Sequence, residues 1–190
     1  QPDPSVAYLA LVSLFDDDTV AYGSDSPDLI DTGAGNDTVI AGDGEDQVVK
    51  WKAGNLFLDG GDGVDTLQFQ PDGVDVPDPP AGAIVNLATG TGTNPYGGTL
   101  TLLHIEQVIG TVMNDSIVGD DGDNYLSTRG GADTILGGGG NDVVIVSRYT
   151  HDSQLDGGPG TDRLIFVIED SAIVTILDLL HPELNTGLFQ

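Results

Sequence analysis

The stretch Gly137-Gly138-Gly139-Gly140-Asn141-Asp142-Val143-Val144-Ile145 decides the fold of this chain. It is a glycine-rich hexapeptide that ends in Asp, followed by three apolar residues of the kind that favour a short strand. The same nine-residue pattern recurs in two blocks of the sequence. Self-similarity at a short, fixed period indicates a solenoid, and so small a unit must stack on its neighbours to bury its apolar residue. We therefore predict an all-β solenoid.

Two positions of the nine-residue unit carry the pattern, because position 6 is Asp or Asn and position 8 is apolar. The first block covers residues 23–68 and the second covers 110–165, with an irregular unit at 146–156. In the first block we place one extra residue, Asp59, before the last unit. Position 6 is held by Asp28, Asp37, Asp46, Asn55, Asp65, Asp115, Asn124, Asp133, Asp142 and Asp162. Position 8 is held by Ile30, Val39, Val48, Phe57, Leu67, Ile117, Leu126, Ile135, Val144 and Leu164.

The other segments are expected to cap or interrupt the repeats. Residues 1–22 form an N-terminal cap whose apolar run at 6–12 fits a strand or a short helix, and we favour a strand. Residues 69–109 form an insert with a proline-rich loop, strands at 83–87 and 99–103 around a turn at 88–98, and a further rung at 104–109. Residues 166–190 form a C-terminal cap. Because the chain begins without Met, we expect it to be a processed or excised piece of a longer protein.

The charge of the chain limits its partners. There are 31 Asp and Glu residues against 5 Lys and Arg, which gives a formal net charge of -26. Nucleic acid is excluded as a partner because binding to phosphates needs a basic footprint. Membrane insertion is not expected either, since no apolar run approaches the length of a membrane span. Self-repulsion of this size destabilises a compact state, so we expect bound cations to neutralise it.

The residues of the repeat suit one kind of cation. Glycine allows the backbone turns that bring successive carbonyl oxygens to one side, and Asp adds a carboxylate on a short stem. Ca²⁺ takes six to eight such oxygens at about 2.3–2.6 Å, whereas Mg²⁺ prefers a tighter octahedron and keeps its waters. Zinc and copper lack ligands, because the chain has no Cys and only three His, namely His104, His151 and His181.

The repeats resemble the RTX (haemolysin-type) calcium-binding nonapeptide of secreted bacterial proteins. The resemblance is carried by residues 137–145, by Gly60-Gly61-Asp62-Gly63-Val64-Asp65-Thr66-Leu67-Gln68, and by the run His104–Gly110 that leads into Asn114-Asp115. It implies a right-handed parallel β-roll in two repeat blocks, with capping strands at both ends. In such a roll each unit is half a coil, and a calcium ion lies between loops that are two units apart.

The resemblance also implies where the ions bind. The expected loop pairs are 23–28 with 41–46, 41–46 with 60–65, 110–115 with 128–133, 119–124 with 137–142, and 137–142 with 157–162, which predicts roughly five Ca²⁺ ions. Position 6 supplies the carboxylate, and the carbonyls of positions 1 to 5 supply the rest. The candidate metal-binding residues are Asp28, Gly33, Gly35, Asp37, Gly42, Gly44, Asp46, Gly60, Asp62, Asp65, Asp115, Gly119, Asp121, Asn124, Gly131, Asp133, Gly137, Gly139, Asn141, Asp142, Gly158, Gly160 and Asp162.

Several units depart from the family pattern. Lys50 and Lys52 place two cations in loop 50–55, which argues against an ion between that loop and loop 32–37. Ser26 and Met113 replace glycine at position 4, and Arg129 stands at position 2. We also expect the irregular unit at 146–156 to lack a proper loop, leaving Asp133 with a partner on one side only.

The sequence shows no catalytic constellation, so we do not expect an enzyme. There is no H-E-x-x-H, G-x-S-x-G or P-loop motif. A plain glycine-rich solenoid in which Asp only makes turns is the alternative to calcium binding. It is disfavoured because turns would also accept Asn, Ser or Gly, and Asp holds position 6 in eight of the ten units.

Three functions are compatible with the repeats. The first is a non-catalytic module of a secreted bacterial protein, extracellular or at the cell surface, that folds when it binds Ca²⁺ outside the cell. The second is a Ca²⁺-dependent structural or adhesive unit of a surface layer, matrix or filament, with self-association or an extracellular polysaccharide as its partner. The third and weakest is an accessory module of a polysaccharide enzyme or metalloprotease.

Overall fold

The computed structural model describes residues 10–13, 16–70, 77–147, 153–168 and 172–178, and all of its regular elements there are strands. These strands are β1 (Ala10–Ser13), β2 (Val20–Tyr22), β3 (Asp28–Asp31), β4 (Asp37–Gly44), β5 (Gln47–Val49), β6 (Leu56–Gly63), β7 (Thr66–Gln68), β8 (Ile84–Asn86), β9 (Thr91–Thr93), β10 (Thr99–Leu103), β11 (Gln107–Ile109), β12 (Ser116–Val118), β13 (Tyr125–Ser127), β14 (Thr134–Leu136), β15 (Val143–Ser147), β16 (Gln154–Asp156), β17 (Arg163–Ile168) and β18 (Ala172–Asp178).

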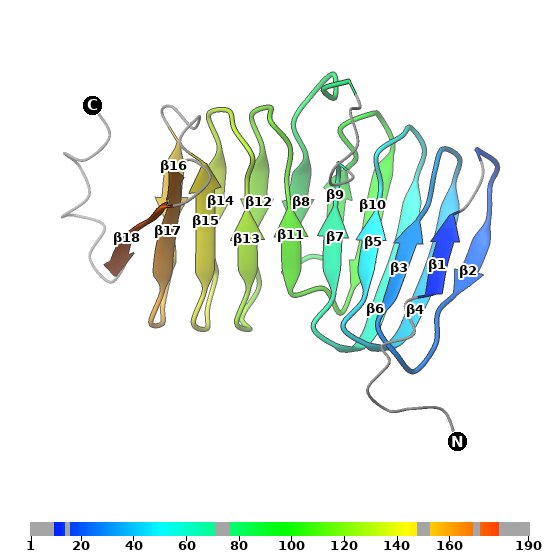
Figure 1. Cartoon of the computed structure of the whole chain (residues 1–190), viewed down its shortest axis with the longest axis horizontal. Coiled ribbons are helices and arrows are strands. Elements are labelled where there is room, and N and C mark those ends of the chain that lie inside the picture. The colour runs from blue at the N-terminus through cyan, green and yellow to red at the C-terminus, as the bar shows by residue number, and fades with distance from the viewer. Residues whose placement is uncertain (1–9, 14–15, 71–76, 148–152, 169–171, 179–190) are drawn as a thin grey trace.

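The strands form two long sheets that face each other, as Figure 1 shows. Sheet A has the order β1-β3-β5-β7-β11-β13-β15-β17-β18, and sheet B has the order β16-β14-β12-β8-β9-β10-β6-β4-β2. In the two repeat blocks the chain alternates between the sheets, so each repeat strand pairs in parallel with the strand one full coil away. Ile30 of β3, for example, is the register partner of Val48 of β5. The predicted all-β parallel roll is confirmed.

The core is a single row of apolar side chains from each sheet. Because side chains alternate between the two faces of a strand, only the middle residue of a three-residue strand points inward. From sheet A these residues are Ile30, Val48, Leu67, Val108, Leu126, Val144 and Leu164, and all of them are buried. Sheet B contributes Ala21, Val39, Leu58, Leu102, Val85, Ile117 and Ile135. One continuous cluster runs through both repeat blocks.

The insert is built into sheet B. In sheet A, β7 pairs directly with β11, so no other strand of the insert lies between these two. In sheet B, three strands lie between β6 and β12. β10 pairs in parallel with β6, β8 pairs in parallel with β12, and β9 lies antiparallel between β10 and β8. The expected strands around 83–87 and 99–103 and the rung at 104–109 are present, whereas β9 lies in the segment predicted to be a turn.

The register of the unit after β5 corrects our sequence assignment. We placed Phe57 at position 8 and an extra residue at Asp59. The structure instead pairs Leu58 with Val39 and Leu56 with Asp37, and it buries Leu56 and Leu58 fully while Phe57 is only half-buried. The additional residue therefore lies inside loop 50–55. Burying two leucines and exposing one face of Phe57 favours this register over the one with regular spacing.

The segments expected to be caps are described in part. In the N-terminal segment, residues 1–9 lie outside the described residues, while β1 and β2 pair in parallel with β3 and β4, as the repeat strands do. In the C-terminal segment, β18 closes sheet A by pairing antiparallel with β17, and residues 179–190 lie outside the described residues. In the ranges that the structure describes, no helix is long and apolar enough to cross a membrane.

The corrected register predicts a difference between two neighbouring substitutions. Leu58→Ala should destabilise the fold by about 2–5 kcal/mol, since it leaves a cavity in the core. Phe57→Ala should cost clearly less, because that ring is half-exposed. Urea denaturation of both variants in millimolar Ca²⁺ measures the two costs. A larger loss for Phe57→Ala would contradict this register.

Candidate metal centre

The position-6 carboxylates form a buried ladder along the roll. Asp28, Asp37, Asp46, Asp65, Asp115, Asp133, Asp142 and Asp162 are all at most 3% exposed, as is Asn124. The backbone N–H of one position-6 residue donates to the Oδ1 of the position-6 Asp one coil later. These N···O distances are 2.8 Å for Asp28 to Asp46, 2.9 Å for Asp46 to Asp65, 3.0 Å for Asp115 to Asp133, 2.8 Å for Asn124 to Asp142 and 2.9 Å for Asp142 to Asp162.

The second oxygen of most of these carboxylates has no protein partner. The unpartnered buried oxygens are Asp28 Oδ1, Asp46 Oδ2, Asp65 Oδ2, Asp133 Oδ2, Asp142 Oδ2 and Asp162 Oδ2. Leaving a carboxylate oxygen buried without a hydrogen bond or a cation is strongly unfavourable. The loops from sheet B to sheet A form what we call edge 1, and the loops from sheet A to sheet B form edge 2. All six oxygens except that of Asp133 lie on edge 1.

Glycines shape the space around these oxygens. At position 1, a Cβ on Gly60 or Gly137 would lie 2.5 or 2.3 Å from the Oδ2 of the Asp in the same unit, so only glycine leaves that oxygen room. At positions 2 and 4 the glycines have positive φ, for example 112° at Gly42 and 138° at Gly44. Positive φ is readily adopted only by glycine. The same conformation occurs at Gly33, Gly35, Gly131, Gly158 and Gly160.

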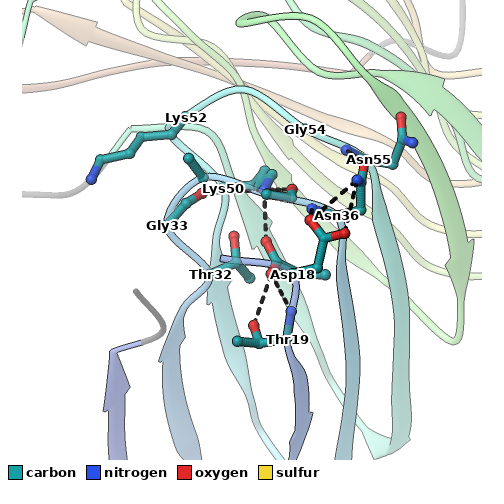
Figure 2. Close-up of polar contacts among 12 residues, drawn as sticks. Asp18, Thr19, Thr32, Gly33, Asn36, Lys50, Lys52, Gly54 and Asn55 are labelled. Atoms are coloured by element: carbon teal, nitrogen blue, oxygen red, sulfur yellow. Dashed lines mark hydrogen bonds and ion pairs between the residues drawn. The ribbon is translucent and has the colours of Figure 1, made fainter. Parts of the chain in front are cut away.

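We call the carbonyls of positions 2 and 4 of a loop, together with the side chain at position 6, its cradle. One loop shows what kind of group a cradle accepts. In loop 32–37 the ammonium of Lys50, a residue of the next coil, lies 3.1 Å from Gly33 O, 3.1 Å from Gly35 O and 2.9 Å from Asp37 Oδ2 (Figure 2). These acceptors are the carbonyls of positions 2 and 4 and the position-6 carboxylate. Asp37 Oδ1 meanwhile accepts from Thr19 of the preceding coil. The cradle therefore holds a cation between two stacked loops.

Burial also changes the acidity of the ladder. The pKa of Asp65 and of Asp142 is raised to about 6, mainly by burial and also by neighbouring carboxylates, against a lowering by the hydrogen bond from the preceding coil. Burial likewise raises the pKa of Asp115 to about 6 and raises the pKa of Asp46 and Asp133. Without cations, the folded chain therefore holds these protons more tightly than an exposed Asp would.

The five loop pairs predicted from the spacing are stacked neighbours, as the ladder hydrogen bonds show. They are not equivalent, because the Lys50 geometry places the cation between the loop that supplies the carboxylate and the following loop. By this criterion Asp46 and Asp142 leave Oδ2 free in the pairs that begin with loops 41–46 and 137–142. In loop 23–28 the Asp28 Oδ2 already accepts from Ser24 N and Ser24 Oγ, and the unpartnered oxygen is Oδ1. Gly60 and Gly137, predicted as ligands, line these carboxylates at position 1.

The other two predicted pairs begin with a side chain that already has partners. Both oxygens of Asp115 are hydrogen-bonded: Oδ2 accepts from Thr111 N, and Oδ1 accepts from Thr111 Oγ1 and Ala83 N. The Asn124 side chain is neutral, and its Oδ1 accepts from Asp120 N. The neighbouring Gly119, predicted as a ligand, leaves room for that amide oxygen.

The predicted ligands at positions 3 and 5 lie farther out. Asp62, Asp121 and Asn141 are exposed, and Gly139 is half-buried against Asp121. Asn141 belongs to a second, outer ladder: its backbone N–H donates to Asp123 Oδ1, and its own Oδ1 accepts from Thr161 N. This ladder aligns successive loops with hydrogen bonds and does not converge on the unpartnered carboxylate oxygens.

Sequence reasoning missed three residues that complete the ladders. Glu106 Oε2 accepts from Asp65 N, so Glu106 takes the place of a position-6 Asp in the insert. Ser153 Oγ does the same for Asp133 N in the irregular unit. Asn94, which is buried, donates to two carbonyls of loop 50–55. Glu106 and Ser153 can be recognised as equivalents of position 6 only from the strand pairing, and Asn94 belongs to no repeat.

The donor set fits calcium. Among the described residues, no group of three or more His, Cys, Asp or Glu side chains could by itself hold a metal ion. The cradle of loop 32–37 instead combines two backbone carbonyls with one carboxylate oxygen. An all-oxygen shell of carbonyls and carboxylates is what Ca²⁺ prefers.

Comparison with known proteins agrees with this geometry. The family model of the RTX calcium-binding nonapeptide repeat matches residues 15–48 and 109–144, in four copies. A search of curated proteins found no significant match to the chain. The matched segments contain the stacked loops 23–28, 41–46, 128–133 and 137–142, where buried carboxylate oxygens lack a protein partner. The chain thus carries RTX calcium-binding nonapeptide repeats, folded as a parallel β-roll.

Proposed function

We propose that this chain is a non-catalytic module of a secreted bacterial protein that folds when it binds Ca²⁺ outside the cell. The observation that carries the proposal is the set of buried carboxylate oxygens without a partner, most of them in glycine-rich loops. Cations at these oxygens would remove the cost of burying them. Extracellular calcium modules typically bind at about 10⁻⁴–10⁻³ M, so the ion is available outside the cell and scarce inside it.

Charge couples the binding of calcium to folding. The unfolded chain spreads a formal net charge of -26 over an extended coil, whereas the roll stacks carboxylates one above another. At tenfold excess over its dissociation constant, each bound ion would add about 1.4 kcal/mol to stability. A core with one inward side chain per short strand contributes little burial per residue, so the ions would supply a large share of the total.

Calcium titration tests the proposal directly. In a chelator such as EGTA the chain should give the far-UV circular dichroism spectrum of a disordered protein. Millimolar Ca²⁺ should convert it to a β-sheet spectrum in a cooperative transition, because the cations neutralise the buried ladder. Millimolar Mg²⁺ serves as the control and should not have this effect. A β-sheet spectrum already present in EGTA at about pH 7.5 would overturn the proposal.

The effect of a single carboxylate on calcium binding should be distinguishable from the effect of net charge. Asp46→Asn keeps the Oδ1 acceptor of the ladder but replaces the unpartnered oxygen with an amide nitrogen. We expect it to weaken calcium binding at the affected site by at least about tenfold, since ligand charge sets affinity. The matched control is Glu45→Gln, which changes the same charge on an exposed neighbour. Equal calcium affinities of the two variants, measured by isothermal titration, would contradict the assignment of Asp46.

The raised pKa values predict the pH dependence of the metal-free chain. The raised pKa values mean that Asp65, Asp115 and Asp142 hold a proton up to about pH 6 in the folded chain, whereas an exposed, unfolded Asp has a pKa of 3.8. Between these values the folded state binds more protons, so its stability falls as the pH rises through this window. In calcium-free buffer we therefore expect more β-sheet signal at about pH 4.5 than at about pH 7.5.

The same protons should compete with calcium. Acidification from about pH 7.5 to about pH 5.5 should raise the calcium concentration at half-saturation, because the carboxylates must lose their protons to bind the ion. The shift should be smaller in Asp142→Asn. A calcium affinity that does not change over this range would show that these carboxylates do not bind the ion.

A further inference from the structure

Each N–H group of the Lys50 ammonium has an acceptor in the cradle of loop 32–37. Its side chain and that of Asp37 are both fully buried, at 0% exposure, and the Nζ–Oδ2 distance is 2.9 Å. The two carbonyls of loop 32–37 accept the other two N–H groups of the ammonium. All three donors of the lysine are therefore used, and no buried charge is left without a partner. Lys52, two residues later, points away from the loop in Figure 2 and pairs with Asp16 at the surface.

The next cradle on edge 2 is filled as well, by a neutral group. Because the additional residue of loop 50–55 lies before Lys52, the carbonyls of Lys52 and Gly54 correspond to those of Gly33 and Gly35. This match is confirmed by the stacking of Gly54 on Gly35. Asn94 Nδ2 donates to both carbonyls, at 2.7 Å and 3.2 Å. Asn94 is 2% exposed and comes from the turn between β9 and β10.

The charge of each occupant matches the residue at position 6. The cradle of loop 32–37 contains the Asp37 carboxylate, and its occupant is a cation. Directly after loop 50–55, Leu56 holds position 6 in place of an acid, and the occupant of this cradle is an uncharged amide. A chance contact would not be expected to follow the charge of the cradle in both cases. On edge 1 of the same block, Asp28, Asp46 and Asp65 each keep an oxygen without a partner.

We propose that Lys50 and Asn94 are built-in occupants of two calcium cradles, so that edge 2 of the first block is held together without metal. The inference rests on the proposed function, because it takes the equivalent cradles on edge 1 to bind Ca²⁺. It assigns the ions of the first block to edge 1 alone. It also makes loop 32–37 a latent calcium site that the lysine keeps closed.

Removal of the lysine tests the latent site. Lys50→Gly restores the residue that stands at position 1 in units such as 60–68 and 137–145, and it opens the cradle of Gly33, Gly35 and Asp37. We expect this variant to bind one more Ca²⁺ per chain than the parent chain in equilibrium dialysis. Lys52→Gly is the matched control, since it removes the same charge from the same loop and should bind the parental number. Asn94→Ala should also bind the parental number, because its cradle has no carboxylate.

The outcomes separate this inference from the proposed function. A parent chain that binds no Ca²⁺ would overturn the proposed function. A folded Lys50→Gly variant with the parental number of ions, while the parent chain binds several, would overturn only the assignment of Lys50. An additional ion in Lys52→Gly as well would attribute the gain to net charge and would also overturn it.

A second measurement keeps the assignment testable if Lys50→Gly does not fold. In the calcium-loaded parent chain, acetylation by an amine-reactive ester should modify Lys50 at least about tenfold more slowly than Lys52, because the buried amine reacts only after local opening. Mass spectrometry of the peptides gives both rates from the same sample. Equal rates would show that the ammonium of Lys50 does not stay in its cradle.

Discussion

The burial of the position-6 carboxylates is the constraint on which the rest of this structure depends. One oxygen of most ladder Asp residues accepts a hydrogen bond from the coil before it, and this contact sets the stacking of coils. In Asp46, Asp65, Asp133, Asp142 and Asp162 the other oxygen is buried as well and has no protein partner. The roll is therefore stable only if a cation or a side-chain donor reaches that oxygen.

The two edges of the roll meet this requirement differently. On edge 1, Asp46, Asp65, Asp142 and Asp162 keep an unpartnered Oδ2 in loops with glycine at positions 2 and 4. On edge 2, the chain supplies its own donors: Lys50 to Asp37, Thr111 to Asp115, and Asn94 to the loop that lacks an acid. Two residues depart from this division: Asp133 on edge 2 keeps an unpartnered oxygen, and Asp28 on edge 1 accepts from Ser24 as Asp115 does from Thr111. The insert contributes to it, because the turn before β10 brings Asn94 onto loop 50–55, and Glu106 continues the ladder of edge 1 across the interruption.

Periodicity was sufficient to predict a solenoid with the position-8 residues in its core, and the resemblance to RTX repeats predicted the roll and the stacking of loops two units apart. Periodicity failed where a unit has an additional residue: regular spacing favoured Phe57 as the core residue, whereas packing selected Leu58. It also could not show which carboxylate oxygens already have partners. Those of Asp115 depend on Thr111 and on Ala83, the latter 32 residues earlier, and the contact of Ala83 exists only once the insert has folded. Glu106 and Ser153 likewise join the ladder through tertiary pairing.

A crystal structure of the chain grown in millimolar Ca²⁺ would test the account most directly. Anomalous scattering would locate each ion without reference to the loops. The account predicts ions about 2.3–2.6 Å from Asp46 Oδ2 and Asp142 Oδ2, and it predicts the Lys50 ammonium, with no ion, beside Asp37. Calcium beside Asp37 with Lys50 displaced into solvent, or no calcium at Asp46 and Asp142, would contradict it.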